Sequence, residues 1–307
     1  MSVRNISAIA LLLAMVIPSQ VSAQTSGLAF LEIGVNAEAA AMGDAHVTSA
    51  SNAFSVFWNP AGLASQTTNS GALAHHIWVA DDRSYAGAVR LGSGSSGGFG
   101  LFVLANAIDE IEQRDRPGPA TGSFSAQYLT TGIGYGRTLG PVRIGASIKY
   151  VSEKVLEVSA RGYAVDLGTQ VEVAQKSVVL GLAVTNLGKM DELSTVETTL
   201  PTTVRGGVSL YPFRMIMEDN TRLVNSTLAV DVSYNEPAKQ TRVHIGAGAE
   251  VVEMLTIRAG YITNDALRGL TAGLGLAINE LRFDYAMIPF ENGFGGPGHI
   301  MSLMYTW

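Results

Sequence analysis

The sequence of 307 residues contains no cysteine. We therefore expect no disulfide bond, no thiolate metal site and no lipid-modified N-terminal cysteine. Charged side chains are also scarce, at 15% of the residues, and the formal net charge is −6. Because nucleic-acid phosphates are bound by clustered lysine and arginine, this composition argues against a nucleic-acid partner.

Long apolar runs are missing as well. Beyond the first twenty-odd positions, no stretch approaches the roughly eighteen consecutive apolar residues that a membrane helix needs. Nevertheless, 47% of the residues are hydrophobic and the mean hydropathy is +0.23. Only helices and closed barrels satisfy every backbone polar group in lipid, so a membrane location would require a β-barrel.

The first 23 residues have the pattern of a secretory signal peptide. Arg4 precedes an apolar stretch over residues 8–17, Pro18 ends that stretch, and small side chains precede a cleavage point near Ala23. We therefore assign residues 1–23 to a signal peptide. The mature protein is expected in the bacterial cell outer membrane.

From about residue 70 onward, apolar side chains alternate with polar or small ones in segments of roughly ten residues, although the first three segments alternate poorly. In the clearest segment, Val142 and Ile144 alternate with Arg143 and Gly145. A two-residue period predicts strands with one apolar face, as barrel strands have. The fourteen candidates are residues 72–80, 83–91, 98–107, 127–138, 142–152, 161–173, 177–187, 202–211, 224–234, 241–252, 254–263, 269–279, 281–290 and 298–307.

The connections between these segments show a second pattern. Short links such as residues 139–141 alternate along the chain with longer ones such as residues 108–126 and 188–201. Short turns at one rim and longer loops, here of modest size, at the other are typical of an outer-membrane barrel. Two links break the alternation, because residues 81–82 are short and residues 212–223 are long.

The last predicted strand ends on alternating large side chains, Met301, Leu303, Tyr305 and Trp307. Aromatic residues at this position fit the girdle that marks the membrane boundary of a barrel. We therefore predict an all-β fold, a transmembrane antiparallel β-barrel of about fourteen strands, over residues 72–307. A soluble β-sandwich is the alternative.

Residues 24–71 do not follow the strand pattern. Residues 37–42 favour a short helix that ends at Gly43. Further on, an asparagine precedes a proline at the first position of a second helix, in a hatch motif formed by Trp58, Asn59, Pro60, Ala61 and Gly62. Because the segment is too short to form a core alone, we predict a small helical hatch, or plug, in the barrel lumen.

Motifs for cofactors and catalysis are weak. The glycine pattern at residues 132–136 lies within a predicted strand and opens no helix, so we interpret it as inner-wall space for the hatch. His75 and His76 point to opposite faces of one strand and cannot bind one metal from the same side. No nucleophile-elbow signature occurs. We therefore predict no enzymatic activity, no cofactor and no metal site.

Charged residues of the barrel fall mostly on the strand phase that faces away from lipid, where charge is tolerated. They either pair with one another and with the hatch, or they line a solute pathway. We favour pairing, since it is the usual use of buried charge. The candidate lumen charges are Arg143, Lys149, Asp166, Arg205, Asp231, Arg258, Arg282 and Asp284.

Two stretches of the expected hatch resemble the PorV/PorQ family of outer-membrane proteins. They are residues 29–45, AFLEIGVNAEAAAMGDA, and residues 52–63, NAFSVFWNPAGL. That family is similar to the FadL-type fatty-acid channels, whose hatch carries a comparable Asn-Pro-Ala motif and whose barrel has fourteen strands. The resemblance implies a role in the type IX secretion system, in which family members shuttle secreted cargo or take part in surface attachment.

These observations predict a non-enzymatic outer-membrane barrel that acts in protein secretion or surface attachment. Its expected partners are outer-membrane lipid, secreted cargo proteins and secretion-system subunits. The alternative is a FadL-like passive channel for the transport of a hydrophobic small molecule. A purely structural barrel is a third hypothesis.

Overall fold

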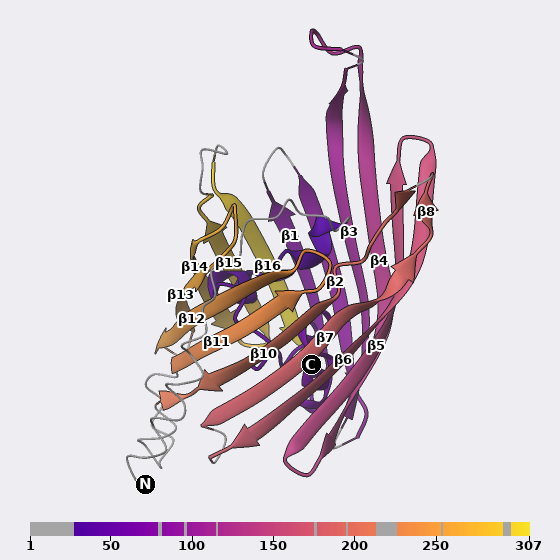
Figure 1. Ribbon diagram of the computed structural model, residues 1–307. Coiled ribbons are helices and arrows are strands. Elements are labelled where there is room, and N and C mark those ends of the chain that lie inside the picture. Colours follow the sequence, from indigo (N-terminus) through magenta and orange to yellow (C-terminus); the bar gives the residue numbers. More distant parts are fainter. Residues whose placement is uncertain are drawn as a thin grey trace.

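The computed structural model describes residues 28–78, 82–94, 97–114, 116–174, 177–194, 196–212, 226–252, 254–290 and 296–307. The predicted signal peptide lies outside these residues. The described chain forms a closed barrel around several short helices (Figure 1). None of the described helices is both long and apolar enough to cross a membrane.

Fourteen antiparallel strands form the barrel, which confirms the predicted fold class and strand count. Each candidate segment overlaps one strand, and β1 pairs with β16 to close the ring. The strands are β1 (Ser70–Ile77), β2 (Arg83–Gly92), β3 (Gly97–Gln113), β4 (Gly122–Leu139), β5 (Val142–Val155), β6 (Val158–Val173), β7 (Val178–Met190), β10 (Thr203–Leu210), β11 (Ser226–Asn235), β12 (Gln240–Val252), β13 (Leu255–Ile262), β14 (Leu270–Ile278), β15 (Leu281–Ile288) and β16 (Gly298–Thr306).

Side chains alternate between two environments along these strands. In β14, Thr271 and Gly273 are buried inside, whereas Leu270 and Leu274 lie exposed on the outer face. The first strands alternate as well. Their inward positions carry small residues such as Ala86, which made the pattern faint in the sequence. The outer face is therefore apolar, as a wall in contact with lipid must be.

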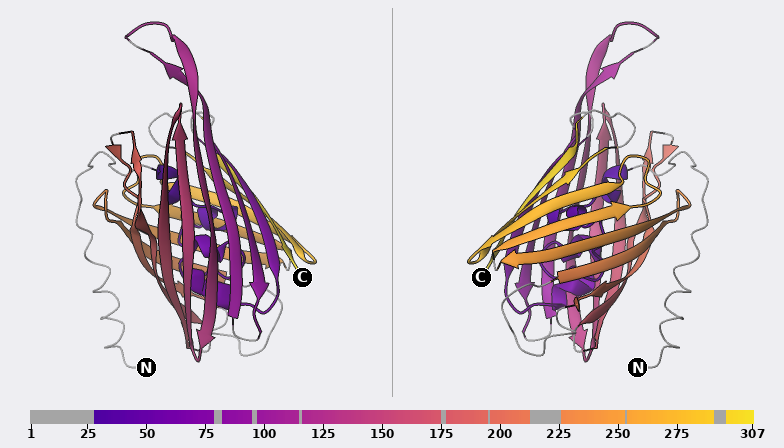
Figure 2. Two further views of the ribbon diagram at one scale, coloured as in Figure 1. Left: turned by 90° about the vertical axis from the view of Figure 1, so that its right-hand side faces the viewer. Right: turned by 90° about the vertical axis from the view of Figure 1, so that its left-hand side faces the viewer.

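The connection between β3 and β4 differs from the predicted loop over residues 108–126. β3 continues to Gln113, which pairs with Gly122 of β4, and this hairpin projects beyond the other strands (Figures 1 and 2). The described residues of its projecting part, 109–114 and 116–125, are exposed or half-buried. Neither face of the hairpin therefore carries the row of apolar side chains by which the sequence analysis identified strands. We call this end of the barrel the hairpin rim, and the other end, with turns such as residues 140–141, the turn rim.

The predicted loop over residues 188–201 also contains regular structure. β7 extends into this region, and a separate pair of two-residue strands, β8 (Glu192–Leu193) and β9 (Val196–Glu197), follows it. The hairpin rim therefore carries more folded structure than the modest loops that the sequence indicated.

Four short helices precede β1 and lie inside the barrel in both views of Figure 2. They are η1 (Ala29–Glu32), α2 (Ala37–Ala41), α3 (Ser55–Trp58) and η2 (Pro60–Ala64). Gly43, with a φ of 64°, follows α2 where the predicted helix end lies. The second predicted helix is present but is a 3₁₀ helix. We call residues 28–69 the plug.

Inward-facing glycines give the plug its space. A Cβ atom added to Gly134 would lie 3.1 Å from Leu63 Cδ1, and one added to Gly136 would lie 3.0 Å from Leu63 Cβ. On the other side of the lumen, a Cβ at Gly260 would collide with the backbone of Met42. The interpretation of residues 132–136 as inner-wall space is therefore confirmed.

Candidate functional site

The plug is joined to the barrel wall by an ionic network near the hairpin rim. Glu32 binds Arg242 at 2.9 Å, and Asp44 binds Arg268 at 2.7 Å. Asp265 lies between the two arginines, 3.7 Å from Arg242 Nε and 2.8 Å from an Arg268 nitrogen. We call these five residues the arginine–carboxylate chain. It couples two carboxylates of the plug to the wall.

A second ionic group joins α2 to β13 and β15. Glu38 lies 3.1 Å from Arg282 and 3.6 Å from Arg258. Asp284 binds the same two arginines at 3.0 Å and 2.9 Å. Three of the predicted lumen charges thus meet around one carboxylate of the plug.

Arg205 and Asp231 form a third contact with the plug. Asp231 Oδ2 accepts hydrogen bonds from the backbone N–H groups of His46 at 2.8 Å and Val47 at 2.9 Å. Arg205 lies 3.9 Å from that carboxylate, and its guanidinium carbon is 5.3 Å from the centre of the Trp58 ring. This distance allows a cation–π interaction.

The remaining predicted charges pair within the wall. Lys149 lies 2.8 Å from Asp166, whose other contacts include the backbone N–H of Asn186 at 2.8 Å. Arg143 binds Glu172 at 2.7 Å. The structure therefore separates Arg143, Lys149 and Asp166 from the groups that hold the plug.

Asn59 of the hatch motif is fully buried and connects three backbone segments. Its Oδ1 accepts a hydrogen bond from the N–H of Ala61 at 3.1 Å, which is the cap that the sequence indicated. Its Nδ2 donates to the carbonyl groups of Val47 at 2.9 Å and Thr169 at 3.1 Å. Asn59 therefore fixes η2 to the rest of the plug and to β6.

The other motif residues are also buried, but they act through packing. Trp58 donates its indole N–H to Asn36 Oδ1 at 2.8 Å, and Pro60 is the first residue of η2. A Cβ added to Gly62 would collide with the carbonyl oxygen of Ala50. The motif thus shapes the plug.

Burial and charge set the protonation of two plug residues. Burial raises the pKa of Glu38, but Arg282 and Arg258 outweigh burial and lower this pKa to about 2. Burial lowers the pKa of His46 to about 4, against the opposing effect of Glu38. At neutral pH the plug therefore holds a charged Glu38 and a neutral His46.

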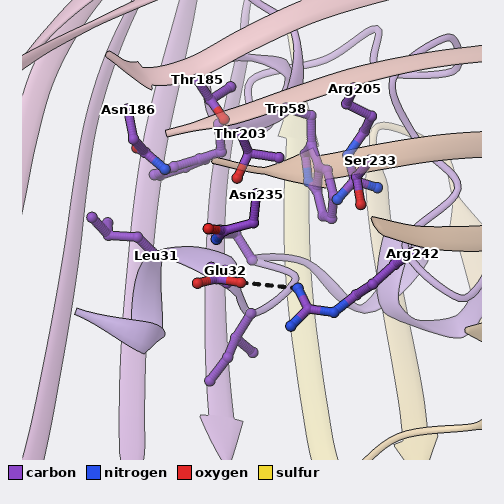
Figure 3. Close-up of a pocket in the computed structure, with 13 residues that line it drawn as sticks. Leu31, Glu32, Trp58, Thr185, Asn186, Thr203, Arg205, Ser233, Asn235 and Arg242 are labelled. Atoms are coloured by element: carbon purple, nitrogen blue, oxygen red, sulfur yellow. Dashed lines mark hydrogen bonds and ion pairs between the residues drawn. The ribbon is translucent and has the colours of Figure 1, made fainter. Parts of the chain in front are cut away.

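A small cavity of about 60 Å³ lies between the plug and the wall (Figure 3). The plug contributes Glu32 and Trp58 to its lining. The wall strands β7, β10, β11 and β12 contribute mainly polar side chains, which are labelled in the figure as Thr185, Asn186, Thr203, Arg205, Ser233, Asn235 and Arg242.

A larger cavity of about 390 Å³ lies at the hairpin rim and shares Glu32, Ile33 and Arg242 with the small one. Phe30 and Tyr128 stand in its lining with their ring centres 5.3 Å apart. Its other large apolar side chains include Leu28, Trp78, Ile108 and Leu267.

This volume and mixed lining suit a small organic molecule that carries few polar groups. Metal binding has no comparable support. Within the described ranges, no group of three or more histidine, cysteine, aspartate or glutamate side chains could hold a metal ion.

Several residues of this region were missed by sequence reasoning. Glu32 and Asp44 lie in the plug, and Asp265 and Arg268 lie in the connection between β13 and β14, so strand phase says nothing about them. Asn235 could have been found, because it continues the inward phase of β11 two positions beyond another buried polar residue.

No protein-family model and no curated protein matches the sequence. Solved structures do share its fold. The CymD monoaromatic hydrocarbon channel has a TM-score of 0.58 at 13% identity, over 89% of this chain and 97% of its own. The toluene transporter TodX of P. putida has a TM-score of 0.56 at 13% identity, over 89% of this chain and 97% of its own.

The described chain therefore shares the fold of these two structures, a closed antiparallel barrel of fourteen strands. An identity of 13% establishes the fold and no more.

Proposed function

We propose that this protein is a passive channel of the bacterial outer membrane that admits hydrophobic small molecules. The observation that carries the proposal is the larger cavity of about 390 Å³ at the hairpin rim, whose mixed lining includes apolar and aromatic side chains. A cavity of this size and character is typical of a site for a small organic ligand. CymD is a monoaromatic hydrocarbon channel and TodX is a toluene transporter, and their similar fold supports the same substrate class for this protein.

The proposal includes the division of the chain. Residues 1–23 act as the signal peptide, and the plug controls passage through the barrel, which begins with β1 at Ser70, two residues before the predicted boundary. Residues of η1 line the cavity at the hairpin rim. A molecule that enters from this rim therefore contacts η1 before the rest of the plug.

Uptake of ethylbenzene by intact cells of a host without its own hydrocarbon channel tests the proposal. Ala29 is an exposed residue of the cavity lining, so Ala29→Trp should fill the cavity and lower uptake severalfold. Ala120→Trp is the matched control, since Ala120 is exposed at the same rim but outside the cavity lining. Uptake no faster than in cells with an empty vector would refute the channel function.

A PorV/PorQ-like role in type IX secretion or surface attachment is the second candidate. It is supported by the resemblance of residues 29–45 and 52–63 and by the projecting β3–β4 hairpin, which offers a surface to a cargo protein or a secretion subunit. The solved neighbours favour the channel. If secretion is the role, loss of the gene should retain cargo in the periplasm, and normal surface display would rule it out.

A further inference from the structure

Two hydrogen-bond donors in the small cavity lack a partner among the described residues. Asn235 is 2% exposed, and its Oδ1 accepts the backbone N–H of Ala238 at 3.0 Å. Because only the oxygen can accept this bond, the amide orientation is fixed, and Nδ2 is left buried without a hydrogen bond.

The second donor is Arg242 Nε. The two terminal nitrogens of Arg242 donate to Glu32 at 2.9 Å and to Gln240 Oε1 at 2.7 Å. Nε lies 3.7 Å from Asp265, which is too long for a hydrogen bond, and it makes no other with the described part of the chain.

Buried donors without acceptors destabilise a fold, so each of them calls for an explanation. Both of these donors line the same cavity, which Figure 3 shows with Asn235 and Arg242 on neighbouring strands above and beside Glu32. Each of these two side chains can donate a hydrogen bond to an acceptor atom placed in the cavity. An incoming ligand can supply that acceptor.

The sizes of the two cavities indicate which part of such a ligand each cavity can hold. The small cavity, at about 60 Å³, holds a few atoms, whereas the larger one, at about 390 Å³, holds a ring or a short apolar chain. Arg242 and Ile33 line both cavities, so a polar group at the end of an apolar body comes within reach of both donors.

The local charges decide which polar group fits. The arginine–carboxylate chain contains two arginines and three carboxylates, and Arg205 with Asp231 adds one of each. Three positive groups therefore face four negative ones. Among these seven described groups no positive charge is left to balance a ligand carboxylate, and a neutral oxygen is the better match.

We propose that this site selects apolar molecules that carry one neutral oxygen acceptor, such as an aromatic ketone. The apolar body occupies the larger cavity, and the oxygen accepts hydrogen bonds from Asn235 Nδ2 and Arg242 Nε in the small one. This inference rests on the channel function proposed above and narrows its substrate class beyond plain hydrocarbons.

Three probes of similar size test it in the uptake assay: acetophenone, ethylbenzene and benzoate. The measurement is the concentration that gives half-maximal uptake, corrected for cells with an empty vector. Two new hydrogen bonds should lower this concentration for acetophenone by about tenfold relative to ethylbenzene. Benzoate should be the poorest probe, because its charge has no counterion.

Asn235→Asp tests the assigned donor, since it keeps an oxygen for the Ala238 N–H and removes Nδ2. The acetophenone preference over ethylbenzene should fall from about tenfold to about threefold, because the hydrogen bond from Arg242 Nε remains. Asn69→Asp is the matched control, because Asn69 Oδ1 also accepts a backbone N–H, from Gly92 at 3.0 Å, but at the turn rim. Asn235→Leu removes both polar atoms of the amide. If its unboiled barrel keeps the gel mobility of the folded protein, a lost acetophenone preference reflects lost selectivity and not lost folding.

The outcomes distinguish this inference from the channel function. Equal half-maximal concentrations for acetophenone and ethylbenzene would mean that Asn235 Nδ2 and Arg242 Nε donate to water and not to the ligand. That result would overturn the inference but not the proposed channel function. A preference for benzoate would overturn the neutral-oxygen assignment. Absence of uptake for all three probes would overturn the channel function and the inference together.

Discussion

Asn59 is one polar side chain whose loss should loosen the whole plug. Asn59→Ala removes the cap of η2 and both donated hydrogen bonds, although the Val47 carbonyl keeps its bond from Gln170. We expect the plug to lose about 2 kcal/mol of stability, measured by protease protection of residues 37–63 in the folded barrel.

The control for this prediction is Asn69→Ala. It removes a single, more exposed acceptor at the turn rim and should cost less than about 1 kcal/mol. Equal protection in the two variants would show that Asn59 does not fix the plug.

His46 should make the plug sensitive to mild acid. An unfolded His46 takes up a proton near its ordinary pKa of 6.5, whereas the buried imidazole resists protonation until about pH 4. Its contribution to the free energy of unfolding is therefore complete above pH 6.5 and declines as the pH falls toward 4, by at most about 1.4 kcal/mol per pH unit.

His46→Gln should flatten this decline when denaturant unfolding of the plug is followed at pH 7.0 and pH 4.5. His75→Gln is the control, because His75 stacks on Tyr85 at the outer face of the barrel. An unchanged pH dependence in His46→Gln would contradict the assignment.

At the scale of elements, the fit between η2 and the inner wall depends on glycine. A Cβ at Gly145 of β5 would collide with the backbone of Pro60 and Ala61, whereas one at Gly206 of β10 would lie 3.6 Å from its nearest neighbour. Gly145→Ala should therefore cost about 1–3 kcal/mol, and Gly206→Ala should cost little.

The temperature at which the folded band disappears on semi-native gels measures this difference. Displacement of η2 should also expose the plug to protease in Gly145→Ala alone. The same transition temperature for both variants would mean that β5 can move to accommodate a Cβ atom at Gly145, and it would contradict the prediction.

The elements also show where sequence reasoning succeeds. Period-two alternation located the barrel strands because one face meets lipid and the other meets the plug, so the two faces need different side chains. The β3–β4 projection lacks such a contrast, and its cluster of charged residues indicated a loop instead. Alternation of apolar and polar side chains cannot detect paired strands whose two faces are both exposed to solvent.

For the whole molecule, the sequence predicted the closed barrel and a helical segment within it, and it favoured ion pairs between lumen charges and that segment, but it did not predict which residues pair. Inward phase identified Arg205 and Arg282 as lumen residues. Their plug contacts, Trp58 and Glu38, depend on how the barrel folds around an irregular segment, and no local pattern encodes that arrangement.

Removal of the plug should convert the barrel into an open pore. Deletion of residues 28–69 leaves a lumen lined by glycines and charged side chains, including Arg258, Arg282 and Asp284, which would be filled by water. We expect ion conductance in planar bilayers to rise well above that of the full chain. Conductance at the level of the full chain, in a variant with the gel mobility of a folded barrel, would show that the wall itself closes the lumen.

The plug contacts also constrain the order of assembly. Ala37 donates its backbone N–H to the hydroxyl of Ser302, 265 positions later, and Glu38 binds Arg282, 244 positions later. Helix α2 therefore stays without these contacts until the last strands are in place, whereas η2 can already pack on β5 and β6. Docking of α2 therefore requires that β15 and β16 are in place. Until then, α2 has to remain in solution beside the incomplete barrel.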